Sequence, residues 1–278
     1  MHSTKQCGRL SSKILKALVF LSAAATFAIL IFLIGFILIK GVRYLTPGLF
    51  AWVYTSENVS LIPAAVNTVT MTMITLLIAV PLGVCAAIFL VEYSAKDSKV
   101  VQVIRMTAET LSGIPSIVYG LFGMMFFTTA LGWGISILSG AFTMGIMILP
   151  LIMRTTEEAL KSVPDSYREA SFGLGAGKLR TIFKIVLPAA IPGILAGVIL
   201  STGRIVGETA ALMFTAGTVA NIPSSLFGSG RTLALHMYVL SNEGLHMNEA
   251  YATAVVLLVL VVMINGLSSI AAKKLSKV

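Results

Sequence analysis

The chain has 278 residues, of which 57% are hydrophobic and 11% charged, and its mean hydropathy is +0.95. This composition excludes an ordinary soluble domain and indicates an integral membrane protein. The net charge of +9 would favour nucleic acid as the partner of a soluble protein, but here the basic residues gather in particular loops. Orientation in the bilayer therefore explains them better. The two cysteines, Cys7 and Cys85, predict neither a disulfide nor a metal site.

A first membrane span is predicted over residues 17–39, an apolar run that follows four basic residues. The run is longer than the core of a signal peptide, so we expect a retained span, with a cleaved signal as the alternative. Residues 40–64 come next, and their Trp and Tyr side chains suit a membrane interface. We place this segment outside.

The second span is predicted over residues 65–91 and the third over residues 108–130. Several threonines and Pro81 interrupt the second span, and neighbouring helices can absorb such polar groups, so they predict packing rather than a ligand site. Residues 92–105 between the two spans are charged and are expected in the cytoplasm. In the third span, small residues on successive turns allow close helix contact and Pro115 permits a kink.

Three further spans complete an all-α membrane protein of six transmembrane helices. They are predicted over residues 141–153 (entered from Ile135), 191–214 and 250–272, with residues 215–249 outside. This arrangement places 16 of the 20 Lys and Arg residues inside, three outside and Arg204 within the membrane. The asymmetry predicts that both termini lie in the cytoplasm.

The loop over residues 154–188 is the most informative segment, because it carries six of the 20 basic residues between two spans. Ser166 followed by Glu169 has the spacing of a capping box, which predicts a short helix that begins near Tyr167. Three alternating glycines then allow a sharp turn. Apolar residues at helical spacing follow, which predicts an amphipathic helix that ends at Pro188.

The glycines of this loop resemble a phosphate cradle only superficially. A P-loop needs four residues between its glycines and a Ser or Thr after the lysine. Here Gly173 and Gly177 enclose three residues, and Leu179 follows Lys178. We therefore predict no nucleotide site and no cofactor on this chain.

The same loop resembles a known family motif. It contains Glu169, Ala170 and Ser171, then Gly175, and later Leu187 and Pro188, and so resembles the EAA loop of ABC importer permeases. The resemblance implies a coupling helix that docks on a separate ATPase subunit. Ser171 stands where the pattern usually has alanine, a small-for-small change that leaves close packing possible.

Arg204 and Glu208 form the one charged pair predicted within the membrane. Their i, i+4 spacing puts both on one helical face, and Arg204 lies roughly 18 to 20 Å from the inner boundary of the apolar core. A lone charge there costs at least about 2.5 to 3.5 kcal/mol, so it is normally kept for function. The alternative is an intrahelical ion pair without a substrate role. We favour function, because the planar guanidinium suits an oxyanion such as phosphate.

At this point the resemblance narrows to the PstA-type permeases of phosphate importers, within the MetI-like permease family. The strings SGIPSIVYGLFG and GRIVGET carry it. The likeness also covers Arg154, which is either an exit-side anion contact or one more positive-inside residue. As a hypothesis, Glu208 helps to select phosphate, which keeps a proton to donate at pH 7, over sulfate, which has none.

The resemblance implies a permease that moves phosphate across the cell membrane and performs no bond chemistry itself. It implies three partners: a second related permease chain, two copies of a cytoplasmic ATPase and an extracytoplasmic phosphate-binding protein. We assign residues 65–272 to the permease domain. Residues 1–64 hold the cytoplasmic N-terminus, the first span and an external loop, and residues 273–278 form a cytoplasmic tail.

Three alternatives stay open at this point. A permease for another oxyanion, sulfate or molybdate, is disfavoured by the GRIVGET string. A secondary transporter should show an internal repeat or paired broken helices, and none is evident. An intramembrane enzyme is disfavoured because His2, His236 and His246 fall in predicted loops and the spans carry no Ser-His or metal constellation.

Overall fold

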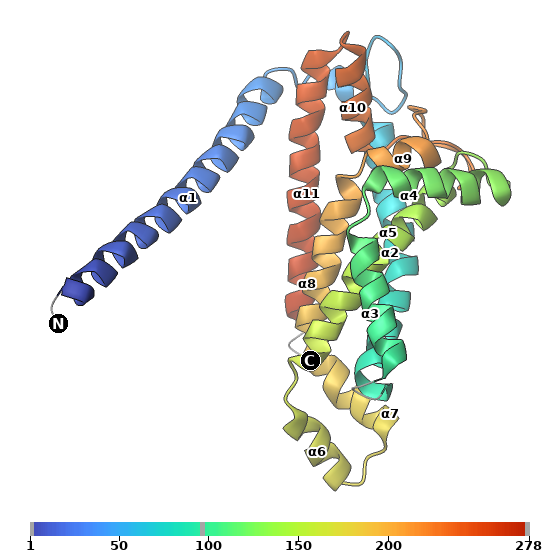
Figure 1. Ribbon diagram of the computed structural model, residues 1–278. Helices are drawn as coiled ribbons and strands as arrows, with labels where there is room; N and C mark the ends of the chain where they lie inside the picture. Colours follow the sequence, from blue (N-terminus) through green and yellow to red (C-terminus); the bar gives the residue numbers. More distant parts are fainter. Residues whose placement is uncertain (1–2, 95–97, 276–278) are drawn as a thin grey trace.

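The computed structural model describes residues 3–94 and 98–275, and every regular element in these ranges is helical (Figure 1). The α-helices are α1 Ser3–Val42, α2 Ile62–Ile88, α3 Lys99–Ser112, α4 Ser116–Gly123, α5 Ile137–Lys161, α6 Asp165–Gly173, α7 Lys178–Thr181, α8 Leu187–Val206, α9 Ala210–Thr215, α10 Leu233–Glu243 and α11 Met247–Leu275. Wider π-helical turns occur at Phe89–Tyr93, Met124–Ala130 and Ile182–Val186, and one 3₁₀ turn at Pro47–Phe50. The prediction of an all-α fold is confirmed.

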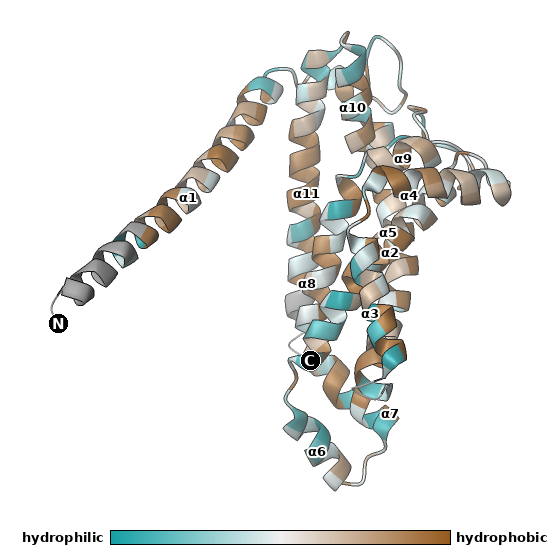
Figure 2. Cartoon of the chain, in the orientation of Figure 1, coloured by the Kyte–Doolittle hydropathy of each residue, from teal (hydrophilic) through white to brown (hydrophobic). Residues whose placement is uncertain are grey.

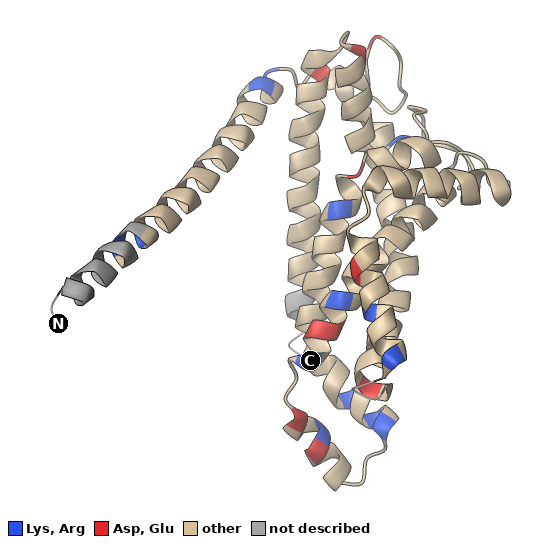
Figure 3. Cartoon of the chain, in the orientation of Figure 1, with Lys and Arg blue, Asp and Glu red and all other residues tan. Residues whose placement is uncertain are grey.

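Five helical segments in the described ranges are long and apolar enough to cross a membrane. A sixth is reached if the bent pair of α3 and the α4 segment counts as one span, which agrees with the six predicted spans. Figure 2 shows apolar residues along the bundle and polar residues toward its ends. Figure 3 shows charged residues gathered at the end that carries α6 and α7, where the described part of α11 also ends.

The predicted third span is not one helix. Its two halves, α3 and the segment from α4 to Ala130, meet at an angle of 101°. Pro115 causes the break, because its ring disfavours helical geometry at the residue before it and it donates no backbone hydrogen bond. Tyr119 in α4 donates to the carbonyl oxygen of Leu111 in α3 at 2.8 Å, which helps to fix the turn. The predicted kink is therefore close to a right angle, and α4 lies across the bundle (Figure 1).

The predicted end of the amphipathic helix at Pro188 is wrong. Helix continues without interruption from Lys178 through the π-helical turn Ile182–Val186 and α8 to Val206. The proline is accommodated because it directly follows the wide turn, where the regular α-helical hydrogen-bond pattern is already interrupted. The helix breaks instead at Gly207, and the short helix α9 begins at Ala210.

The fourth span is longer than predicted, since α5 continues to Lys161 instead of ending near residue 153. Two i, i+4 ion pairs support the added turns: Arg154 with Glu158 and Glu157 with Lys161. Arg154 therefore lies on a helix, and the non-helical part of the basic loop begins after Lys161.

The core of the bundle is formed mainly by α2, α5 and α8, which pack along their lengths. The polar residues of α2 serve packing, as expected. The side-chain amide of Asn67 donates to the carbonyl oxygens of Asn221 and Arg231, and the Thr68 hydroxyl accepts from the backbone N–H of Leu233. These bonds tie α2 to the segment between α9 and α10.

The predicted external segment, residues 215–249, contains the helix α10. His236, which was placed in a loop, lies in α10 and is fully buried against the Tyr54 ring. Arg231 is also buried and stacks over the same tyrosine ring, 4.9 Å from its centre. Burial, and next the charge of Arg231, lower the pKa of His236 to about 3. The imidazole is therefore neutral at physiological pH and cannot act as a proton switch there.

Candidate functional site

Arg204 lies in the last turn of α8 and lines a cavity of about 710 Å³. Its lining is otherwise mostly apolar and comes from α5, α8 and α11: Leu151, Ala196, Ile199, Leu200, Gly203 and Asn265. Asn265 is the other polar residue of this lining, and its buried side-chain oxygen has no hydrogen-bond partner. Within the described residues, no hydrogen bond or ion pair engages the Arg204 guanidinium. The cavity is therefore lined by mostly apolar residues and by one guanidinium that has no hydrogen-bond or ion-pair partner within the described residues.

Glu208 does not share a helical face with Arg204, and that prediction is wrong. Because α8 ends at Val206, Glu208 lies in the break before α9. One of its carboxylate oxygens accepts from the backbone N–H of Ala211 at 3.1 Å and so caps the start of α9. The described residues show no Arg204–Glu208 ion pair. The alternative explanation of Arg204, an intrahelical ion pair, therefore fails.

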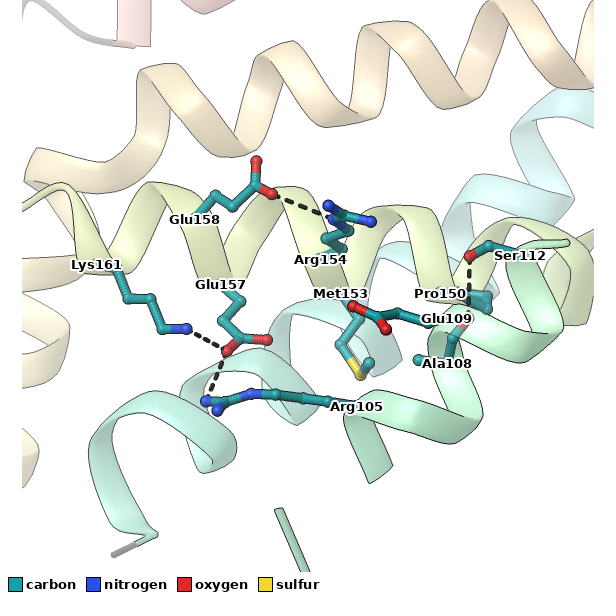
Figure 4. Close-up of a pocket in the computed structure, with 10 residues that line it drawn as sticks. All are labelled: Arg105, Ala108, Glu109, Ser112, Pro150, Met153, Arg154, Glu157, Glu158 and Lys161. Carbon is teal, nitrogen blue, oxygen red and sulfur yellow. Dashed lines mark hydrogen bonds and ion pairs between the residues drawn. The ribbon is translucent and has the colours of Figure 1, made fainter. Parts of the chain in front are cut away.

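Arg154 lies beside a different cavity, of about 200 Å³, near the basic end of the bundle (Figure 4). Its Nε donates to Glu158 at 3.2 Å, and both side chains are about two thirds exposed. The structure does not bring Arg154 and Arg204 into one cavity.

The same cavity contains an ion-pair node that the sequence pattern did not reveal. Glu157 is buried and accepts from Arg105 of α3 at 2.7 Å and from Lys161 at 2.6 Å (Figure 4). The Glu157–Lys161 spacing was visible in the sequence, but the third member lies more than 50 positions upstream. The node ties α3 to α5.

The short helix predicted near Tyr167 is present as α6, but its predicted capping box is not. The helix begins at Asp165 after Pro164, and Ser166 makes no capping hydrogen bond. Pro164 supplies extended geometry at the cap, and the acid of Asp165 in the first turn suits the helix dipole. The prediction therefore placed the helix start about two residues late.

The turn after α6 follows from its glycines and from one hydroxyl pair. Gly175 has a φ of +80°, which an L side chain rarely adopts. Ser171 is buried, and its hydroxyl lies 2.8 Å from that of Thr181 in α7. An alanine at position 171 would lack this bond between the two helices, so the departure from the usual pattern has a structural use.

Of the remaining residues of the predicted coupling motif, two lie on the exposed surface of α6 and two lie at the start of α8. Glu169 and Ala170 are exposed on α6, and Leu187 and Pro188 lie in the first turn of α8. The loop also exposes large apolar side chains: Tyr167, Phe172, Leu174, Leu179 and Phe183. Such an exposed apolar group beside polar residues is typical of a protein-binding surface.

This architecture, an all-helical membrane bundle with a helical hairpin at its basic end, defines a class of transport permeases. Residues 79–277 match the family model described as binding-protein-dependent transport system inner membrane component, and the chain belongs to this family. It is a multi-pass membrane permease component of an ABC importer. Permeases of this family work with ATPase and substrate-binding partners and are not typically catalytic themselves.

Curated relatives cover most of the chain. It is 35% identical over 255 residues to the probable ABC transporter permease protein YqgI of Bacillus subtilis, with 85% of each chain covered. It is 34% identical to the phosphate transport system permease protein PstA of Pasteurella multocida, covering 80% of this chain and 83% of that protein. For PstA 1 of Mycobacterium tuberculosis the identity is 37%, over 68% of this chain and 62% of that protein.

Solved structures share the fold at lower identity. A bacterial ABC transporter that imports the acidic polysaccharide alginate superposes with a TM-score of 0.67 and 14% identity, covering 96% of this chain and 99% of that one. The MetNI methionine ABC transporter gives a TM-score of 0.61 and 19% identity, covering 87% and 97%. These likenesses establish the fold and carry no information on the substrate.

Proposed function

We propose that this chain is the permease subunit of an ABC importer that moves inorganic phosphate into the cytoplasm. The observation that carries the proposal is the guanidinium of Arg204, which lines the cavity between α5, α8 and α11 and has no hydrogen-bond or ion-pair partner within the described residues. The relatives named as phosphate permeases, at 34% and 37% identity, support the choice of phosphate. ATP hydrolysis takes place on a separate ATPase subunit.

The chemistry of the cavity suits an oxyanion. A guanidinium can hold two oxygens of phosphate through parallel hydrogen bonds, and the Arg204 side chain is exposed in the isolated chain, so an anion can reach it. The side chain of Asn265 adds a neutral polar group to the same lining. Arg154, near the inner end of α5, serves as a later contact on the way out.

The proposed assembly contains a second related permease chain, two copies of the ATPase and an extracytoplasmic phosphate-binding protein. Closure of the ATPases pushes on α6 and its turn, the segment from Glu169 to Gly175. Because α7 continues into α8 as one helix, movement of the loop reaches the span that carries Arg204. The path past Arg204 then opens to one side or the other.

Uptake by the reconstituted complex tests this function. Vesicles that contain the complete importer should accumulate labelled phosphate only when ATP is supplied on the ATPase side. Unlabelled phosphate should compete, whereas equal concentrations of sulfate or molybdate should not. Uptake that sulfate or molybdate inhibits as strongly as phosphate would assign the chain to another oxyanion.

Glu208 provides a prediction about selectivity. One of its carboxylate oxygens caps α9, which leaves the other able to accept the proton of phosphate and to repel fully ionised sulfate. We expect Glu208→Gln to keep the cap, because the amide oxygen can replace the carboxylate oxygen, and to reduce discrimination between the two anions about tenfold. Competition uptake with both anions measures it. Unchanged discrimination would assign selection to the binding protein instead.

A further inference from the structure

Arg168, which the predicted coupling motif does not include, makes the most extensive set of polar contacts at the basic end of the described chain. Its Nη2 lies 2.6 Å from Glu92 Oε1, and its Nε donates to the same oxygen at 3.1 Å. It also donates to the carbonyl oxygens of Leu160 at 3.0 Å and Val163 at 2.9 Å. One side chain on α6 thus reaches the last turns of α5, the connection after it and the π-helical turn that ends the second span.

The burial of these groups separates them from ordinary surface ion pairs. The Arg168 side chain is 15% exposed and that of Glu92 is 8% exposed, whereas Asp165, which also contacts Arg168, is 75% exposed. Exposed pairs contribute little because water and salt screen them, while a buried charge that loses its partner is strongly destabilised. The Glu92 contact and the two carbonyl contacts are therefore the effective ones.

The rest of α6 is attached loosely. The described connections around it are a three-residue link from Lys161 and a glycine-rich turn to α7, in which Gly173, Gly175 and Gly177 meet no neighbouring atom at a Cβ position. The hydroxyl bond from Ser171 to Thr181 ties the far end of α6 to α7 only. Among these contacts, Arg168 is the one that fixes α6 to both α5 and the end of the second span.

We propose that Arg168 is a positioning residue that joins α6, the inner end of α5 and the π-helical turn Phe89–Tyr93 into one rigid unit. Force applied to α6 then moves α2 and α5, which pack along their lengths, as well as α8 through α7. Without Arg168, α6 can rotate about the three-residue link after Lys161 and about the glycine-rich turn before α7. An attached ATPase would then move α6 without moving α2 and α5. This inference rests on the proposed role of α6 as the ATPase contact.

Spin-label distances in the assembled importer test the proposal without reference to substrate. In a chain whose native cysteines are replaced, Ser166→Cys on α6, outside the coupling motif, and Phe89→Cys on the π-helical turn place labels at two exposed positions. With Arg168 present, the distance should be the same in nucleotide-free and ATP-bound complexes. Arg168→Ala should make it change by several ångström or broaden on ATP binding.

Two further variants separate this role from general damage. Glu92→Gln keeps the size of the side chain and the carbonyl contacts of Arg168 but removes the charge, and it should give a smaller change of the same kind. Asp165→Asn removes the charge of the exposed contact alone, so it should behave like the unchanged chain. A distance that stays fixed in both Arg168→Ala and Glu92→Gln, or that already changes in the parent chain, would overturn the proposal.

Transport per ATP gives the functional readout. Arg168→Ala should transport at least fivefold less phosphate for each ATP hydrolysed, while the ATPase still copurifies with the permease. A failure of the phosphate assignment would appear as no phosphate uptake by the parent chain, whereas a failure of the present inference would appear in the label distances. A loss of ATPase binding in both variants would assign Arg168 to docking instead.

Discussion

Replacement of Arg204 with alanine is expected to reduce ATP-dependent phosphate uptake at least 100-fold. Hydrogen bonds to charged groups contribute about 1.5 to 3 kcal/mol each, and about 1.4 kcal/mol is a factor of ten. Two such bonds to the anion therefore account for a loss of this size. The fold should persist, because the guanidinium makes no hydrogen bond or ion pair within the described residues. Uptake and copurification of the ATPase, measured on the same preparation, check both parts.

The controls for Arg204 distinguish charge from geometry. Arg204→Lys keeps the charge but loses the planar fork, so we expect it to retain intermediate uptake. Arg43→Ala removes an exposed arginine from the segment before the 3₁₀ turn and should leave uptake unchanged. If Arg204→Ala transports phosphate as well as Arg43→Ala does, the guanidinium is not part of the path.

A second large effect is expected where α4 crosses α9. A Cβ atom at Gly120 would lie 2.8 Å from the Cα atom of Ala211 and 3.0 Å from its carbonyl oxygen. Both neighbours are backbone, which cannot move aside as a flexible side chain can. Gly120→Ala should therefore destabilise the chain by about 1 to 3 kcal/mol, the usual cost of overpacking. The melting temperature in detergent should fall by several degrees.

Gly145→Ala is the matched control, because a Cβ atom there meets only a side-chain methyl of Ile78 at 3.8 Å. Alanine is the better helix former, so this variant should melt at the same temperature or slightly higher. Equal melting temperatures for the two variants would show that α4 and α9 can separate without cost.

The sequence predicted the spans well because apolar length depends on residues that are adjacent in the chain. It failed where helices break. Pro115 predicted a kink, but the size of the turn depends on what packs against it, including the Tyr119 hydroxyl and the contact at Gly120. Pro188 predicts an end of helix, but the π-helical turn just before it accommodates the proline within a continuous helix. The break at Gly207 falls between Arg204 and Glu208, but glycine is too common within membrane helices to predict a break by itself.

The candidate site was predictable only in part. Arg204 stood out because a charge in an apolar span is expensive, an argument that needs no structure. Asn265 lies 61 positions away and joins it only when α8 and α11 pack. The Arg168–Glu92 contact joins residues 76 positions apart, and neither residue is unusual in its own loop. Partners brought together by tertiary packing are beyond the reach of local spacing.

The π-helical turn Ile182–Val186 accommodates one extra residue in the helix that joins the hairpin of α6 and α7 to α8. A wide turn holds one residue more than an α-helical turn, and each residue of an α-helix advances the chain by about 100° around the axis. Excision of a single residue there should let the helix run through as ordinary α-helix, with its backbone bonds intact. Because the shortened segment would still complete about one turn, the hairpin of α6 and α7 would keep nearly its present direction. Excision of one residue from the regular part of α8 would instead turn the hairpin by about 100° relative to the bundle.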